Sequence, residues 1–216
     1  MGVGHLAAGL GLSRADRRTN AGWYVLCALA ADLLLGVFVL LGLEEVHIPP
    51  SFEFRHYVEF TFPYSHGLLA TGVWALAGAV IAWIVAGRRT AALVACAIAS
   101  HFVLDWVTHV PELPLAGEDS RKFGLGLWDK PWAAIAVEVA ATAAGVAAYA
   151  GKAGRARKPM IAYATALAAF LIPGQWLITQ APPAPVLAWN WIGGTVLISG
   201  IAWAIDRLRA KDLSPE

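Results

Sequence analysis

The sequence predicts an all-α membrane protein: a bundle of six spanning helices preceded by a short N-terminal half-helix. Of its 216 residues, 58% are hydrophobic and only 14% are charged, a balance typical of integral membrane proteins. Six apolar segments are each long enough to cross a hydrocarbon core of about 30 Å at about 1.5 Å per helical residue. Basic residues also alternate between successive loops, as in polytopic membrane proteins. We therefore expect one membrane domain over residues 1–216.

The N-terminal segment, residues 1–12, is apolar but has neither a basic start nor a small-residue cleavage site. We therefore interpret it as a short helix of the mature fold rather than a signal peptide. A frayed interfacial tail is the alternative. The six spans are predicted at Gly22–Leu43, Gly67–Ala86, Ala91–Val110, Pro131–Ala150, Pro159–Gln180 and Pro185–Ile205. Cys27 and Cys96 lie within two of these spans and are expected to be packing residues.

Charge divides the loops into two sets. One set is basic and contains Arg14, Arg17, Arg18, Arg88, Arg89, Lys152, Arg155, Arg157, Lys158, Arg207, Arg209 and Lys211. Because cytoplasmic loops carry the excess of arginine and lysine, these loops and the C-terminus are predicted to face the cytoplasm from the cell (inner) membrane. The other loops are mainly acidic and are placed outside, and His47 and His56 there are expected to be solvated. The scattered basic residues predict a lipid bilayer as partner and no nucleic acid.

Ionisable side chains within the spans gather in their outer halves. His101, Asp105 and His109 stand four residues apart, so they share one helix face. Asp32 and Glu138 lie in two other spans. Because ionisable residues inside a membrane are costly, they are functional-site candidates by default. The inner halves of the predicted spans contain none, which predicts a polar pocket open to the outer face above an apolar floor.

Two further residues reach this pocket only along particular backbone paths. His5 and Asp32 stand on the two arms that leave the first basic turn, so a helical hairpin would bring them toward each other. His66 lies at the rim, about 15 Å above Asp32 if half of the bilayer core separates them. The loop before it must therefore dip inward, and Gly36 and Gly42 could let the first span bend.

Imidazoles and carboxylates in this pattern are the ligands that zinc and similar divalent ions use. A divalent cation would also compensate lone pairs and charges that are costly to bury. The predicted metal ligands are His5, Asp32, His66, His101 and Asp105. These ligands suffice for one zinc ion with an open water position or for two ions sharing a carboxylate. Glu138 and His109 are the predicted catalytic proton acceptors.

Each of these residues has a structural alternative. His101 and Asp105 can form a hydrogen-bonded pair that only fixes helix packing. His66 can be an interfacial residue, and His109 can be a wetted helix end or a group that supports a ligand. Glu138 can hydrogen-bond to a neighbouring helix. The spacing of the residues does not choose between these roles.

With these residues laid out in order, the chain resembles the membrane-bound metal-dependent hydrolases of bacteria and archaea. The resemblance covers residues 1–130 and rests on His5, Asp32, SHG at Ser65–Gly67 and SHFVLD at Ser100–Asp105. That family has an early histidine in a short N-terminal helix, an aspartate in the next helix, a (T/S)HS-like motif and an SHxxLD motif. Its ligand style is similar to that of zinc-dependent phospholipases C, which implies hydrolysis of phosphoester or lipid substrates.

The chain departs from the family pattern at two places. The paired PDxD is reduced to Ala31 and Asp32 followed by leucines. The HRGxTHS run is here TFPYSHG, which lacks the first histidine. Both departures remove ligands and so put a second metal ion in doubt.

The sequence therefore predicts a membrane hydrolase in which metal-activated water attacks an ester or phosphoester of an amphiphilic or phosphate-containing substrate. One alternative is a proton- or ion-coupled transporter, because chains of Asp and His also relay protons. The apolar floor and the lack of an inverted repeat argue against a transporter. Another alternative is a non-catalytic protein in which the metal only ties helices together.

Overall fold

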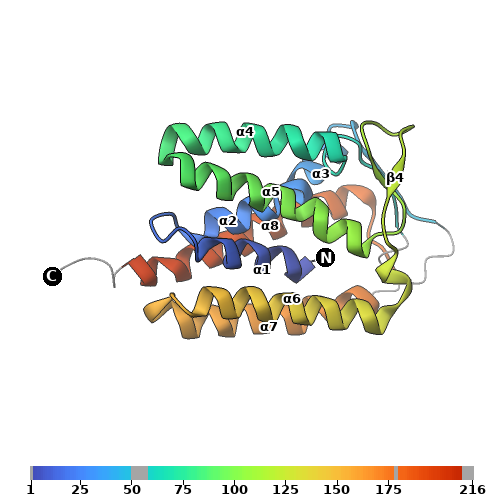
Figure 1. Ribbon diagram of the computed structural model, residues 1–216. Coiled ribbons are helices and arrows are strands. Elements are labelled where there is room, and N and C mark those ends of the chain that lie inside the picture. The colour runs from blue at the N-terminus through green and yellow to red at the C-terminus, as the bar shows by residue number, and fades with distance from the viewer. Residues whose placement is uncertain (1, 50–57, 178–179, 211–216) are drawn as a thin grey trace.

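The computed structural model describes residues 2–49, 58–177 and 180–210, and it is an all-α bundle, as predicted. Its helices run roughly along one axis, and two short antiparallel ribbons lie together at one end, which we call the ribbon end (Figure 1). The helices are α1 (Gly2–Ser13), α2 (Ala21–Ala28), α3 (Ala30–Leu40), α4 (Leu68–Ala86), α5 (Arg88–Thr108), α6 (Pro131–Ala150), α7 (Arg157–Leu177) and α8 (Ala184–Ala210). The 3₁₀ turns are η2 (Leu127–Asp129) and η3 (Gly154–Ala156). The ribbons pair β1 (Glu45–His47) with β2 (Glu59–Thr61), and β3 (Leu113–Pro114) with β4 (Lys122–Phe123).

The long helices match a membrane protein in length and composition. Among the described residues, α4, α5, α6, α7 with its preceding η3 turn, and α8 are long and apolar enough to cross a membrane. The bent pair α2 and α3 makes a sixth candidate span. Helix α8 continues to Ala210, beyond the predicted end at Ile205. His56, Lys211 and residues 178–179 of the predicted fifth span lie outside the described residues.

The first predicted span is broken rather than gently curved. Helices α2 and α3 meet at Leu29 with a bend of 52°. Gly36 does not make this bend, since it packs against α8, where an added Cβ would lie 2.6 Å from the Ala188 carbonyl oxygen. Gly42 follows the end of α3 with a φ of 69°. The break falls three residues before Asp32, and a helix end leaves carbonyl groups without intrahelical donors.

Helix α1 lies inside the bundle, between α5 and α6 and against α2 (Figure 1). The side chains of Val3, Leu6 and Leu10 are fully buried, so residues 2–13 form an integral helix and not a frayed tail. Two glycines allow this close packing. An added Cβ at Gly9 would lie 2.6 Å from the Cα of Val25, and one at Gly145 would lie 2.2 Å from the Ala7 carbonyl oxygen.

A buried polar cluster closes the end opposite the ribbons. Asp16, in the turn between α1 and α2, accepts hydrogen bonds from Tyr24, Thr19 and Thr90. Burial alone would raise the pKa of Asp16, but these bonds lower it to about 2. In α8, Arg209 pairs with Asp206 at 2.8 Å. Ionisable groups are therefore buried at this end as well, just beyond the predicted end of the last span.

An apolar layer separates this polar cluster from the rest of the bundle. Leu6 and Leu10 of α1 pack in one buried cluster with Val25 and Leu29. These residues stand on both arms of the hairpin between its turn and Asp32. The apolar floor expected from the sequence is present among the described residues, although polar groups lie below it.

Replacing Gly9 by alanine is expected to destabilise the protein by about 1–3 kcal/mol, because the new methyl group would meet the backbone of α2. Gly72→Ala is the matched control, because a Cβ at that position of α4 has no heavy atom within 4 Å. This control is expected to change stability by less than about 1 kcal/mol. Unfolding of the purified protein in detergent measures both variants. Equal stabilities would show that the contact between α1 and α2 is looser than described.

Candidate metal centre

Four separate segments bring the five predicted metal ligands together. His5 comes from α1, Asp32 from α3, His66 from the loop before α4, and His101 and Asp105 from adjacent turns of α5. Two overlapping groups have ligand atoms that all lie within 4.8 Å of one another. One contains His5, His101 and Asp105, and the other contains Asp32, His66 and His101. We call these five residues the His/Asp cluster.

Asp105 is the centre of the His/Asp cluster. Its Oδ2 lies 3.0 Å from His101 Nε2 and 3.7 Å from His66 Nε2, and its Oδ1 lies 3.1 Å from His5 Nε2. The Nε2 atoms of His66 and His101 are 3.2 Å apart. Asp32 Oδ1 lies 3.9 Å from each of these two nitrogens. A single carboxylate thus contacts histidines from three different segments.

These distances fit the edges of a zinc coordination shell. Zinc bonds of about 2.0–2.1 Å in tetrahedral geometry place neighbouring ligand atoms about 3.3 Å apart. Six neighbouring donor pairs in the His/Asp cluster are 3.0 Å to 3.9 Å apart. The donor types, neutral imidazole and carboxylate, are those that zinc and similar divalent ions bind. The cluster can therefore hold a metal ion.

Burial makes an uncompensated cluster costly. His5, His66, His101 and Asp105 are all buried, whereas the side chain of Asp32 is 27% exposed. The Nδ1 atom of His5 is buried and has no hydrogen-bond partner among the described residues. The His5 ring also stacks on the His101 ring, with 3.8 Å between centroids. Asp32 is therefore the partly exposed member of the His/Asp cluster.

The break between α2 and α3 orients His101. Its Nδ1 lies 2.8 Å from the carbonyl oxygen of Ala28, the last residue of α2. A carbonyl oxygen only accepts, so Nδ1 carries the proton and donates. In the neutral imidazole, the lone pair of His101 is then on Nε2, which faces Asp105 and His66. This is the arrangement of a metal-binding histidine whose other nitrogen is held by a backbone carbonyl.

His66 is also held as a neutral imidazole. Burial, together with the neighbouring His101, keeps the pKa of His66 well below its usual value. The neutral form is the one that binds a metal ion. The inward dip of the preceding loop, which the sequence required, is present, since His66 Nε2 lies 3.9 Å from Asp32 Oδ1.

His109 lies beside the His/Asp cluster, at the end of α5. Its Nε2 is 3.8 Å from Asp105 Oδ1, and its Nδ1 is 2.5 Å from Glu112 Oε1. The Trp128 ring packs against the His109 ring at 4.0 Å between centroids. Glu112, in one of the acidic outer loops, was not among the predicted site residues. Its position three residues after His109, just beyond the helix end, was the available signal.

Glu138 occupies a different position. It is buried in α6, and its Oε1 accepts a hydrogen bond of 2.9 Å from the backbone N–H of Val3, in the first turn of α1. Its Oε2 accepts a hydrogen bond of 3.1 Å from Gln175 in α7. A carboxylate at a helix N-terminus satisfies free N–H groups and favours the helix dipole. These contacts match the structural alternative, and the catalytic role of Glu138 stays a prediction.

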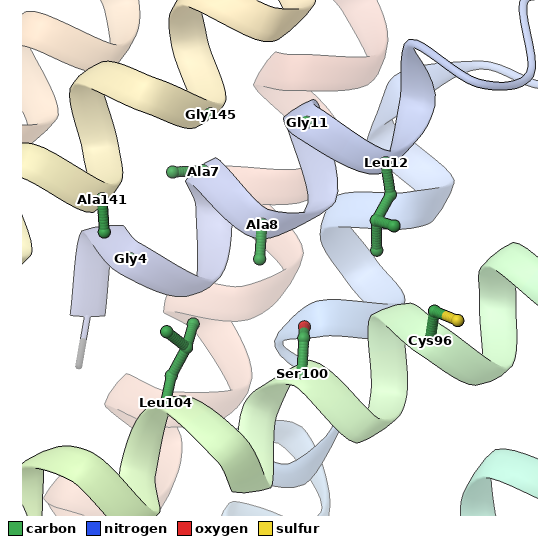
Figure 2. A pocket seen from close by; sticks show the side chains of 10 residues that line it. All are labelled: Gly4, Ala7, Ala8, Gly11, Leu12, Cys96, Ser100, Leu104, Ala141 and Gly145. Atoms are coloured by element: carbon green, nitrogen blue, oxygen red, sulfur yellow. The ribbon is translucent and has the colours of Figure 1, made fainter.

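An apolar groove of about 390 Å³ runs beside the cluster, between α1, α5 and α6 (Figure 2). Small side chains and glycines line most of it, among them Ala8 of α1 and Ala141 of α6. Ser100 and Leu104 form its wall on α5. Each of these two residues directly precedes a cluster residue, His101 or Asp105. The groove therefore follows the same turns of α5 that present the predicted ligands.

Comparisons with protein-family models, with curated proteins and with solved structures found no match to this chain.

Purified protein is expected to bind one zinc ion per chain, and His101→Ala and Asp105→Ala are each expected to lose it. Each change removes a donor at the centre of the cluster, so the affinity should fall by more than the about 10–100-fold that loss of a supporting residue costs. His47→Ala is the control, because His47 is exposed in β1. Metal analysis after equilibrium dialysis measures all four proteins. Equal zinc content in parent and cluster variants would contradict this site.

Proposed function

We propose that the protein is a metal-dependent membrane hydrolase that cleaves an ester or phosphoester bond of an amphiphilic substrate. The observation that carries this proposal is the convergence of five imidazole and carboxylate donors from four segments, in two overlapping groups whose ligand atoms lie within 4.8 Å of one another. A hydrogen-bonded pair that only fixes helix packing would need only two such residues. The resemblance of the SHFVLD and SHG motifs to membrane-bound metal-dependent hydrolases supports the same reaction class.

The chemistry that a bound divalent ion supplies is activation of water near neutral pH and polarisation of the scissile group. His5, His66, His101 and Asp105 would hold the ion on the buried side of the cluster. Asp32 would complete the ligand set at the partly exposed side, where water and substrate arrive. The same residues fit one zinc ion better than two, because both candidate groups share His101.

His109 is the better placed of the two predicted proton acceptors. Its Nε2 faces Asp105, while Glu112 holds Nδ1 at 2.5 Å. A carboxylate accepts the Nδ1 proton, which leaves the Nε2 lone pair directed at the cluster. Both oxygens of Glu138 accept hydrogen bonds from Val3 and Gln175, so this carboxylate is already engaged.

The surroundings support an amphiphilic substrate. Five helices are long and apolar enough to cross a membrane, and the groove between α1, α5 and α6 offers an apolar surface along the turns of α5 that carry His101 and Asp105. An acyl or other hydrocarbon chain favours such a surface over water. We place the ribbon end outside the cell (inner) membrane, since the basic loops lie at the opposite end and are expected to be cytoplasmic.

A non-catalytic metal site is the second candidate function. The burial of four of the five predicted ligands favours it, because structural zinc sites are closed whereas catalytic sites keep an open position. The apolar layer of Leu6, Leu10, Val25 and Leu29 argues against a conduction path to the opposite end, and so against a transporter. Turnover of a substrate separates the two metal-binding roles.

The zinc-loaded protein is expected to hydrolyse at least one member of a panel of lipid esters and phosphoesters presented in mixed micelles. Asp105→Ala should be inactive, because it removes the carboxylate that contacts three histidines. Release of the free acid or phosphate measures turnover. Zinc retention without cleavage of any panel member would favour the non-catalytic role, and activity only across an ion gradient would favour a carrier.

His109→Asn is expected to keep its zinc and lose about 10²–10⁴-fold in kcat, the usual contribution of a positioned acid or base. Glu138→Gln is the matched comparison, since it changes a buried carboxylate that contacts α1 and α7 instead. Glu138→Gln should lower the melting temperature and leave kcat close to that of the parent. A large loss of kcat in Glu138→Gln, with kcat retained in His109→Asn, would transfer the proton-acceptor role to Glu138.

A further inference from the structure

We propose that Glu44 and Ser65 are positioning residues that hold His66 with its proton on Nδ1 and its Nε2 lone pair facing the His/Asp cluster. The inference rests on the metal-binding part of the proposed function, and it names two residues outside the predicted ligand set. Glu44 and Ser65 are each 1% exposed, and His66 is 4% exposed. Water is therefore kept away from all three side chains.

Glu44 first fixes the backbone that carries His66. Its Oε1 accepts hydrogen bonds of 2.8 Å from the backbone N–H groups of both Tyr64 and Ser65. Glu44 follows the end of α3, so these bonds tie the loop before α4 to the first span. The inward dip of His66 thus has a physical cause, since a buried carboxylate satisfies the donors of a segment that no strand or helix pairs.

The hydroxyl of Ser65 then determines which nitrogen of His66 carries a proton. Ser65 Oγ lies 2.7 Å from Glu44 Oε2 and donates its single proton to that carboxylate. Ser65 Oγ also lies 2.8 Å from His66 Nδ1. With its own proton already given to Glu44, Ser65 can only accept at this second contact. His66 must therefore donate from Nδ1.

The inferred hydrogen-bond chain takes Glu44 as an ionised acceptor. Three donors point at its two oxygens, namely the N–H groups of Tyr64 and Ser65 and the Ser65 hydroxyl. Burial raises the pKa of Glu44 above its usual value, although these three hydrogen bonds stabilise the charged form. The direction of the Ser65 hydrogen bond is inferred from this arrangement of donors.

The tautomer of His66 determines how it faces His101 at the centre of the His/Asp cluster. His101 already carries its proton on Nδ1, which donates to the Ala28 carbonyl. With His66 in the same tautomer, two Nε2 lone pairs face each other across 3.2 Å. When both rings are neutral, neither nitrogen can donate to the other, so a cation between them relieves the repulsion. Glu44 and Ser65 thereby convert a possible hydrogen-bonded histidine pair into a pair of metal donors.

The hydrogen bonds from His66 to Ser65 and from Ser65 to Glu44 form a chain that we call the relay. Glu44→Gln tests the relay because the glutamine amide nitrogen would donate to Ser65, which reverses the direction of both bonds. The amide oxygen can still accept from Tyr64 and Ser65, while the amide nitrogen donates to Ser65 Oγ. The Ser65 hydroxyl must then turn to His66 Nδ1, and the His66 proton moves to Nε2, where it blocks the metal. Nitrogen NMR of ¹⁵N-histidine-labelled, metal-free protein reads the tautomer, with the His66 signal identified by its loss in His66→Ala.

We expect His66 to be the Nδ1–H tautomer in the parent and the Nε2–H tautomer in Glu44→Gln. Zinc affinity should fall by about 10–100-fold in Glu44→Gln and in Ser65→Ala. Ser13→Ala is the matched control, because its buried hydroxyl donates to the Leu10 carbonyl and not to a carboxylate or imidazole. It should bind zinc as the parent does.

An Nε2–H tautomer in the parent, or parent-like tautomer and zinc affinity in Glu44→Gln, would overturn the inference. A parent that shows Nδ1–H at His66 and inverts in Glu44→Gln, yet binds no zinc, would uphold the relay and reject the proposed function. If Glu44→Gln does not fold, the tautomer of the parent and the zinc affinity of Ser65→Ala decide the matter.

Discussion

A carboxylate and three imidazoles packed together among apolar helices set the constraint on which this structure depends. Asp105 lies within 3.7 Å of His5, His66 and His101 in a region that excludes most water. Buried polar groups must be paired or must share a compensating charge. Hydrogen bonds to carbonyl and hydroxyl groups satisfy the outer nitrogens of His66 and His101 and leave their inner nitrogens facing one another. A bound cation is the compensation that these donors match.

Three departures from a simple helical bundle serve this cluster. Because the helix breaks at Leu29, the Ala28 carbonyl is available to accept a hydrogen bond from His101 Nδ1. Asp32, just after the break, lies near His101 Nε2. The dipping loop brings His66 inward, and Glu44 holds it there. Helix α1 begins inside the bundle, where Glu138 accepts from its first turn and so places His5. Irregular backbone is tolerated in a membrane protein where buried side chains satisfy it, as they do at these positions.

Helical periodicity and hydropathy were sufficient to predict the fold class, the approximate spans and the shared face of His101 and Asp105. The dip of His66 also followed from depth alone, because a rim residue and a mid-span residue cannot otherwise meet. The break at Leu29 could not be predicted, since no proline or glycine marks it. Glu44 and Glu112 belong to the acidic loops, and their roles could not be predicted because the burial of Glu44 and the partial burial of Glu112 depend on tertiary packing. The burial of Asp206 and Arg209 was not predicted, because α8 continues past the apolar segment from which the last span was predicted.

The position of a bound ion is the decisive measurement. Crystals of the protein grown with zinc, measured on both sides of the zinc absorption edge, would locate the metal by its anomalous signal. We expect a peak between the Nε2 atoms of His66 and His101 and the Oδ2 atom of Asp105, with ligand distances of about 2.0–2.2 Å. A cluster with no peak at saturating zinc, or zinc bound only at exposed histidines such as His47, would contradict this expectation.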